Sequence, residues 1–276
     1  MTSAIYYEET QSLVQTFSQE DQAYFQDLWD YFNFAGFLYE EKALREQIYN
    51  LALDFSQASG NGLTSKDYFG QDPKGMSDQI IENMPKESTR YVLKYGAIVS
   101  GIVIFYRLLS DFASQAVLVL KPLVYLTDSI LGILAVGLLF YLLRRLIFAE
   151  EKSKKAIYVA VVLVLGIYFI SEIVGVRFLP AFAWLTVPNP WDTLLITGAS
   201  GVLILWQWKE EIGRAFVFPI LAFLVVGFLH RWTLAQGIQN STMTMILPTV
   251  IIVIGLMIYY WFTIRALKKN KTENGE

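Results

Sequence analysis

Six stretches of about 20 mostly apolar residues follow residue 90, and they constrain the fold more than any other feature. A helix rises about 1.5 Å per residue, so a stretch of this length spans the roughly 30 Å hydrocarbon core of a bilayer. Hydrophobic residues make up 54% of the chain and charged residues 17%, below the about 25% usual in soluble domains. The sequence therefore predicts an integral membrane protein with about six spans, near residues 91–109, 122–143, 156–176, 192–208, 215–234 and 243–264.

The residues before these stretches carry the pattern of small amphipathic helices. In one predicted helix, Leu44, Ile48, Leu51 and Phe55 repeat at spacings of three and four, so they form one buried stripe. We therefore expect an all-α fold in three parts. These are an acidic cytoplasmic helical domain at 1–88, called the head, then a transmembrane domain of six helices at 89–266 and a basic, polar cytoplasmic tail at 267–276.

Charge is divided unevenly along the chain. Residues 1–85 carry 14 acidic and 4 basic side chains, and the remainder carries 11 acidic and 18 basic ones, which gives net charges of −10 and +7. Of the Lys and Arg residues that flank the spans, eleven fall on one side and four on the other. The positive-inside rule assigns the richer side to the cytoplasm, so we expect both termini inside the cell membrane. The acidic head disfavours direct binding to nucleic acid, whose phosphates are also negative.

A short motif in the head resembles a known family. A helix ends in glycine, a short turn follows, and Phe69, Gly70, Asp72 and Pro73 then open another helix. This arrangement resembles the HAAS-type helical domain, which is found in bacterial membrane proteins with several spans. The resemblance implies a role in signalling beside PadR-like helix-turn-helix regulators. Each of these residues also has a plain helix-capping interpretation, because Gly70 suits a helix end and Asp72 with Pro73 suits a helix start.

Four ionisable residues lie at a similar depth within the predicted spans: Arg107, Asp128, Glu172 and Arg231. Each is 15 or 16 residues, about 24 Å, from the inner end of its span. One interpretation is an outer polar cavity in which the arginines pair with the carboxylates and a small polar ligand binds. The other is that they are interfacial side chains that extend to water.

No pattern of catalytic or cofactor-binding residues is present in the sequence. The chain has no cysteine and one histidine, His230, without a second metal ligand at helical spacing. It also lacks the phosphate-binding loop, the zinc-protease motif and the serine-hydrolase motif. We therefore expect no enzyme activity, no metal and no cofactor.

Two segments of the membrane part are ambiguous. Residues 110–121 are amphipathic, which is typical of an interfacial or re-entrant segment, and Lys121-Pro122 interrupts any continuous helix. The fourth predicted span is the shortest and contains Gly198 and Gly201, but without it the basic C-terminal tail would lie outside the cell.

Three hypotheses for function follow from these features. The first is a signalling or regulatory membrane protein whose spans sense an envelope condition and whose head docks a cytoplasmic partner, with a PadR-like regulator as the candidate. The second is a component of small-solute transport or resistance that uses the outer polar cavity. The third is a scaffold whose head organises a larger membrane complex.

Overall fold

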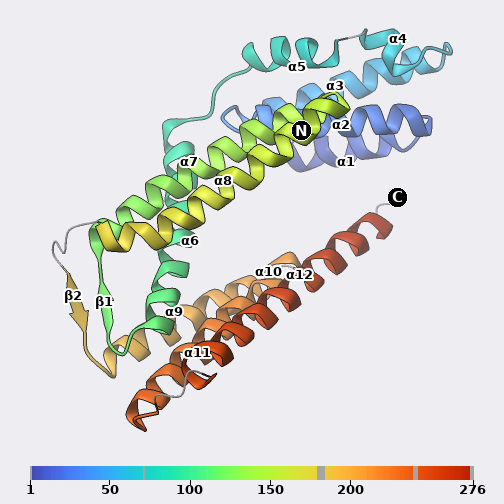
Figure 1. The fold of residues 1–276 in the computed structure, drawn as a ribbon. Helices are drawn as coiled ribbons and strands as arrows, with labels where there is room; N and C mark the ends of the chain where they lie inside the picture. Colours follow the sequence, from blue (N-terminus) through green and yellow to red (C-terminus); the bar gives the residue numbers. More distant parts are fainter. Residues whose placement is uncertain (1, 71, 179–183, 210, 239–241, 274–276) are drawn as a thin grey trace. The chain divides into compact units, whose positions relative to one another are not determined.

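The computed structural model describes every residue except 1, 71, 179–183, 210, 239–241 and 274–276, and within helices it leaves the side chains of 172–178, 211–212 and 267–273 undescribed. The described part is almost entirely helical, which confirms the predicted all-α fold (Figure 1). It forms two compact units, Met1–Ser100 with Ile130–Arg177 and Gly101–Ser129 with Phe178–Glu276. This division crosses two long helices and differs from the head and membrane domains expected from the sequence, which stay a prediction.

The head contains five helices: α1 (Ser3–Val14), α2 (Gln19–Ala35), α3 (Glu41–Ser59), α4 (Ser65–Phe69) and α5 (Pro73–Glu82). The hydroxyl of Ser18 accepts a hydrogen bond from the Asp21 amide and so caps the start of α2. Helix α1 packs on α3, and α5 packs on α2. The predicted helix with the stripe of Leu44, Ile48, Leu51 and Phe55 is confirmed as α3, in which Leu51 is partly buried and the other three are buried.

Two aromatic-rich clusters form the core of the head. The first, called the Tyr31 cluster, contains Trp29, Tyr31, Phe32, Ala35, Leu44, Ile48 and Ile81. The second, called the Phe25 cluster, contains Phe17, Phe25, Leu28, Ala52, Phe55 and Ala58. Each fully buried large apolar side chain contributes about 1.5–3 kcal/mol, so the clusters supply most of the driving force for folding the head.

Five helical segments in the described part of the chain are long and apolar enough to cross a membrane. They run over Thr89–Ser114, Pro122–Ile147, Glu151–Ser171, Gly213–Ala235 and Thr242–Ala266. The corresponding elements are α6 (Thr89–Ser114), α7 (Pro122–Ile147), α8 (Glu151–Phe178), α10 (Glu211–Ala215) with α11 (Val217–Ala235), and a π-helical turn η1 (Thr242–Ile246) with α12 (Leu247–Glu273). These five segments are compatible with a multi-pass membrane protein.

The fourth predicted span forms a helix of the expected length, one residue earlier in the chain. It is α9 (Trp191–Gln207), whose 17 residues extend about 26 Å, just below the roughly 30 Å of a hydrocarbon core. The structure therefore provides five clear candidate spans rather than six, and α9 is an apolar helix of marginal length.

Large apolar side chains cover the outer faces of the long helices. In α8, Val162, Ile167 and Phe169 are 67%, 66% and 63% exposed, and in α12 Met257 and Tyr260 are exposed to a similar extent. Soluble monomers rarely expose apolar surface over whole helices, whereas a bilayer covers such faces.

The first predicted span continues further than expected, because α6 extends to Ser114 and takes up the first part of the segment 110–121. The segment then forms β1 (Leu118–Leu120), which pairs antiparallel with β2 (Leu185–Val187) in the register Leu118↔Val187. As expected from the sequence, Pro122 begins a new helix.

Candidate functional site

Two arginine–carboxylate pairs in the second unit are joined by the C-terminal half of α6. Arg107 and Asp111 are four residues apart and so face the same side of that helix. The Arg107 Nη1 atom lies 3.3 Å from Asp128 Oδ2 in α7, and its Nε atom lies 3.6 Å from Asp111 Oδ1. The Tyr125 hydroxyl donates a hydrogen bond of 2.9 Å to Asp111 Oδ2. All four side chains are buried.

The second pair joins α9 to α11. Arg231 Nη2 lies 2.9 Å from Asp192 Oδ2, and the Asp192 side chain is fully buried. Arg231 Nη1 also donates to the carbonyl oxygen of Phe112 in α6, and the guanidinium group lies 3.7 Å from the centre of the Phe112 ring. A glycine makes this close approach possible, because a Cβ atom at Gly227 would collide with the Phe112 ring.

The two pairs form one network because Phe112 directly follows Asp111. Gln115 extends it by donating to Asp111 Oδ1 at 3.0 Å and accepting from the Val119 amide of β1 at 3.3 Å. The polar network is therefore defined by Arg107, Asp111, Tyr125, Asp128, Asp192 and Arg231. It ties α6, α7, α9 and α11 together where the Phe112 cluster of Leu109, Phe112, Leu118, Ile196 and Ile220 packs.

The sequence-predicted polar residues have different positions in the structure. Arg107 and Asp128 come together, as the cavity interpretation expected. Arg231 pairs with Asp192, whereas the side chain of Glu172 lies outside the described residues. The Arg107 side chain is buried and the Arg231 side chain is 12% exposed, and each contacts a carboxylate of the protein. The interfacial interpretation stays a prediction. A ligand-binding role for the network stays a prediction.

In chemical terms the network is well suited to holding helices together. Three carboxylates and two guanidinium groups are removed from solvent, and each carboxylate has a cationic or hydrogen-bonding partner. Burying a charge is costly unless it is paired, so each pair strongly favours the arrangement in which its helices meet. In the described part of the chain no group of acidic residues and histidine is placed to hold a metal ion.

In the first unit, the connection between α7 and α8 is anchored in the core of the head. Phe148, the first residue after α7, packs against both the Tyr31 and the Phe25 clusters. Its ring centre lies 5.0 Å from that of Tyr31. Further up α7, Phe140 contacts Phe34 and Phe37 with ring centres 5.6 and 5.1 Å apart. The head and the hydrophobic helix α7 therefore share one packed interface.

A polar contact inside the head reaches the same interface. The Tyr31 hydroxyl donates a 2.5 Å hydrogen bond to Asp78 of α5, and Lys74 lies 2.9 Å from the other oxygen of that carboxylate. Burial alone would raise the pKa of Asp78, but these two donors and the cationic Arg144 of α7 outweigh it and lower that pKa. For Tyr31, burial and the neighbouring Asp78 both raise the phenol pKa. The carboxylate is thus ionised and the phenol protonated at neutral pH.

The sequence motif of the head acts in capping and packing. Gly70 ends α4 at a φ of +84°, and the Asp72 side chain accepts a 2.8 Å hydrogen bond from the Gly75 amide at the start of α5. Pro73 is the first residue of α5. The Phe69 ring packs against the Phe25 cluster and stacks on Tyr24. These contacts explain the motif without a ligand.

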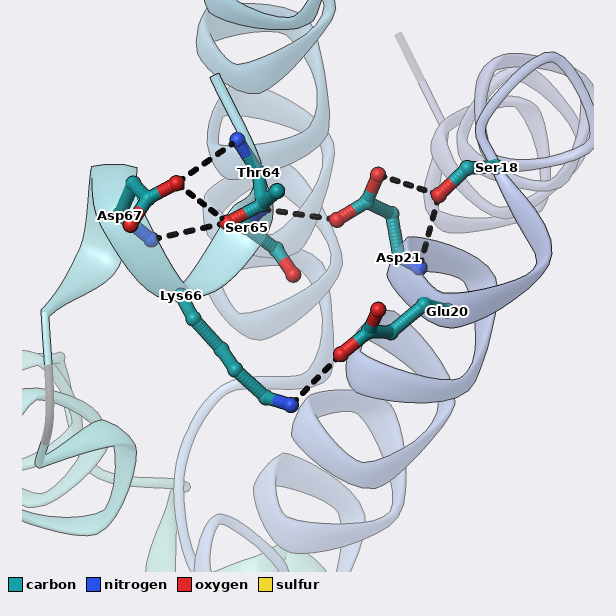
Figure 2. A network of polar contacts seen from close by, with 7 residues as sticks. All are labelled: Ser18, Glu20, Asp21, Thr64, Ser65, Lys66 and Asp67. Carbon is teal, nitrogen blue, oxygen red and sulfur yellow. Dashed lines mark hydrogen bonds and ion pairs between the residues drawn. The ribbon is translucent and has the colours of Figure 1, made fainter.

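Hydrogen bonds and an ion pair in the head hold α4 against the start of α2 (Figure 2). Asp21 accepts hydrogen bonds from the Ser18 hydroxyl at 2.6 Å and from the Ser65 amide at 2.8 Å. Lys66 and Glu20 form an exposed ion pair of 2.7 Å beside it. Burial favours the neutral form of Asp21, but the two hydrogen bonds outweigh it and lower its pKa.

Comparisons with protein-family models, with curated proteins and with solved structures find no match to this chain.

Asp111, Tyr125 and Asp192 are the residues of the polar network that sequence reasoning missed. Asp192 was counted as the first residue of the fourth span, and Asp111 fell in the segment after the first span. A usable signal was present, because Asp111 stands four residues after Arg107 on the same helix face. The pairing of Asp192 with Arg231 has no local signal, since the two are 39 residues apart.

Proposed function

We propose that this chain is a multi-pass protein of the cell membrane, of signalling or regulatory type, whose head passes the state of the spans to a cytoplasmic partner. The packing of Phe148 against both core clusters of the head carries this proposal. A shift of α7 relative to α8 would move this side chain, and the head core would have to repack around it. Close-packed interiors transmit such shifts because they do not deform freely.

The charge distribution supports the orientation and the type of partner in this proposal. The excess of basic residues on one side of the spans supports a cytoplasmic head by the positive-inside rule. A head with a net charge of −10 over residues 1–85 attracts a positively charged protein surface and repels nucleic acid. The HAAS resemblance agrees with this scheme and makes a PadR-like, DNA-binding regulator the candidate partner.

Affinity capture tests the proposal. The full-length protein, a form lacking residues 1–85 and the Phe148→Ala variant are purified from membranes, and the copurifying proteins are identified. We expect a soluble, basic protein that is lost with the head and whose amount changes in Phe148→Ala. Phe169→Ala is the control, because Phe169 is exposed on α8 and packs against neither core cluster of the head. Equal recovery of the same membrane proteins with and without the head would contradict signalling and favour the scaffold hypothesis.

A second candidate function, small-solute transport or resistance, is favoured by one observation: the burial of Arg107, Asp111 and Asp128 in the apolar part of the chain. Asp128→Asn would abolish a solute-dependent phenotype in this case. The double variant Arg107→Leu, Asp128→Leu separates transport from stability, because it removes one charge of each sign while Asp111 keeps the hydrogen bonds that Tyr125 and Gln115 donate. A double variant that is folded but inactive would support transport, and one that restores the phenotype would exclude it.

A further inference from the structure

A groove runs between α3 and α5 on the head. Its volume is about 690 Å³, and its lining includes Glu46, Gln47 and Asn50 from α3, Met76 and Ile80 from α5, and Met84 just after that helix. The lining residues of α5 extend over about one turn, roughly 6 Å, and Asn83, Met84 and Pro85 continue the wall beyond the helix. Asn50 and Gln79 are exposed at its edges, so the groove is open to solvent along its length.

One wall of the groove is apolar and adaptable. Met76 and Ile80 are four residues apart and so share one face of α5, and Met84 continues this wall two residues after the end of the helix. Methionine side chains have flexible, polarisable thioethers that fit partner surfaces of varied shape. An apolar row between two helices is the surface on which an amphipathic helix places its apolar side.

The charge of the groove points to a basic partner. Glu46 lines it, and none of the described lining residues is basic. Glu82 is exposed on α5 beside the lining residue Asn83. Lys74 of α5 is paired with Asp78, and Lys42 and Lys86 adjoin the lining residues Ala43 and Pro85 in the chain without lining the groove. The groove therefore combines an apolar wall with one carboxylate and no cation in its described lining, within a head of net charge −10 over residues 1–85.

The same side chains connect the groove to the membrane helices. Ile80 and Met84 line the groove and also pack on the Tyr31 cluster. Ile147 and Phe148, at the end of α7, pack on that cluster as well. A movement of Phe148 therefore acts on the core that supports the α5 wall.

We infer that the groove between α3 and α5 binds a basic amphipathic helix of a partner protein, two to three turns long, with its apolar side against Met76, Ile80 and Met84. This inference rests on the proposed function, because it names the surface by which the head recruits its partner. Movement of α7 changes the position of the α5 wall and so changes the affinity of the groove.

The test uses the full-length protein in nanodiscs of zwitterionic lipid, with empty nanodiscs as the background. The probe is a synthetic helical peptide of about 14 residues with Leu at core spacing and Lys elsewhere. An otherwise identical peptide with Glu in place of Lys is the charge control. Gln79→Trp and Asn50→Trp fill the groove from its exposed edges. Gln57→Trp is the matched control, because Gln57 is exposed on the same helix as Asn50, two turns further on and outside the lining.

We expect the Lys peptide to bind and the Glu peptide not to bind. Gln79→Trp and Asn50→Trp should weaken binding at least about tenfold, and Gln57→Trp should leave it unchanged. Because the chain has no cysteine, disulfide trapping with a peptide cysteine can then locate the bound helix. Trapping should occur at Asn50→Cys and not at Gln57→Cys. No binding, equal binding of both peptides, or binding that the two groove variants do not change would overturn the inference.

The groove inference and the proposed function can fail independently of each other. If head-dependent capture of the cellular partner persists in Gln79→Trp, the groove inference is wrong and the signalling proposal stands. If the peptide occupies the groove but no protein is recruited through the head in cells, the signalling proposal is wrong.

Discussion

At the scale of single residues, Arg231 and Asp192 form the shortest ion pair among those described in the second unit. The two side chains are 2.9 Å apart and Asp192 is fully buried. Removing one partner leaves an unpaired charge in an apolar environment, whereas removing both leaves none.

Arg231→Leu should therefore lower the free energy of unfolding by about 3–5 kcal/mol. The double variant Arg231→Leu, Asp192→Leu should recover most of that loss, because no buried charge remains. Thermal unfolding of the purified protein in detergent, followed by circular dichroism, measures both. A double variant as unstable as the single one would show that the pair is not what holds these helices.

Asp21 gives the head a defined response to acid. Its pKa is lowered in the folded protein, so its contribution to stability is present above the ordinary aspartate pKa of about 3.9 and is lost as the pH falls through the lower folded value. Asp21→Asn removes this contribution at every pH. We expect the difference in unfolding temperature between wild type and Asp21→Asn to be constant at neutral pH and to shrink below about pH 4. A difference that grows on acidification would contradict the assignment.

At the scale of elements, the contact between α6 and α11 depends on one glycine. Gly227→Ala places a methyl group against the Phe112 ring, and the overpacking should cost about 1–3 kcal/mol. Gly201→Ala in α9 is the matched control, because a Cβ atom there meets nothing within 4 Å. Thermal unfolding should show a loss for the first variant and none for the second. Equal behaviour would mean that α6 and α11 do not pack at this point.

Much of this element structure could be predicted from the sequence, because it depends on local patterns. Hydrophobic stretches located the long helices, and Asp72 with Pro73 marked the start of α5. The extension of α6 to Ser114 could not be predicted, since residues 110–114 are amphipathic and their burial comes from contacts with distant helices. The pairing of β1 with β2 joins residues more than 60 positions apart and has no local signal.

The candidate site was predictable only in part, for the same reason. Arg107 and Asp128 stand at matching depths in consecutive helices, so their encounter follows from hairpin geometry. The packing of Phe148 against both clusters of the head depends on tertiary contacts. A single aromatic residue in a loop gives no local signal of such contacts.

At the scale of the whole molecule, the number of crossings decides on which side the C-terminus lies. The 17 residues of α9 extend about 26 Å, and a bilayer can thin by a few ångströms around such a helix. Single cysteines at Ser3, Ser153, Asn189 and Thr272 can be labelled without background, because the chain has none. We expect labelling from outside only at Asn189→Cys, since the basic tail favours the cytoplasm. Outside labelling of Thr272→Cys would show that α9 does not cross the membrane. Outside labelling of Ser153→Cys would show that the protein has the opposite orientation to the predicted one.

The central claim is that the end of α7 and the head share one packed core, and hydrogen exchange of the full-length protein in nanodiscs tests it most directly. In Phe148→Ala, the amides of α2 and α5 should exchange about tenfold faster than in wild type, because the variant removes a ring that packs on both head clusters. The amides of α9 and α11 should be unaffected, and Phe169→Ala should change nothing in the head. Unchanged exchange in α2 and α5 of Phe148→Ala would contradict the account.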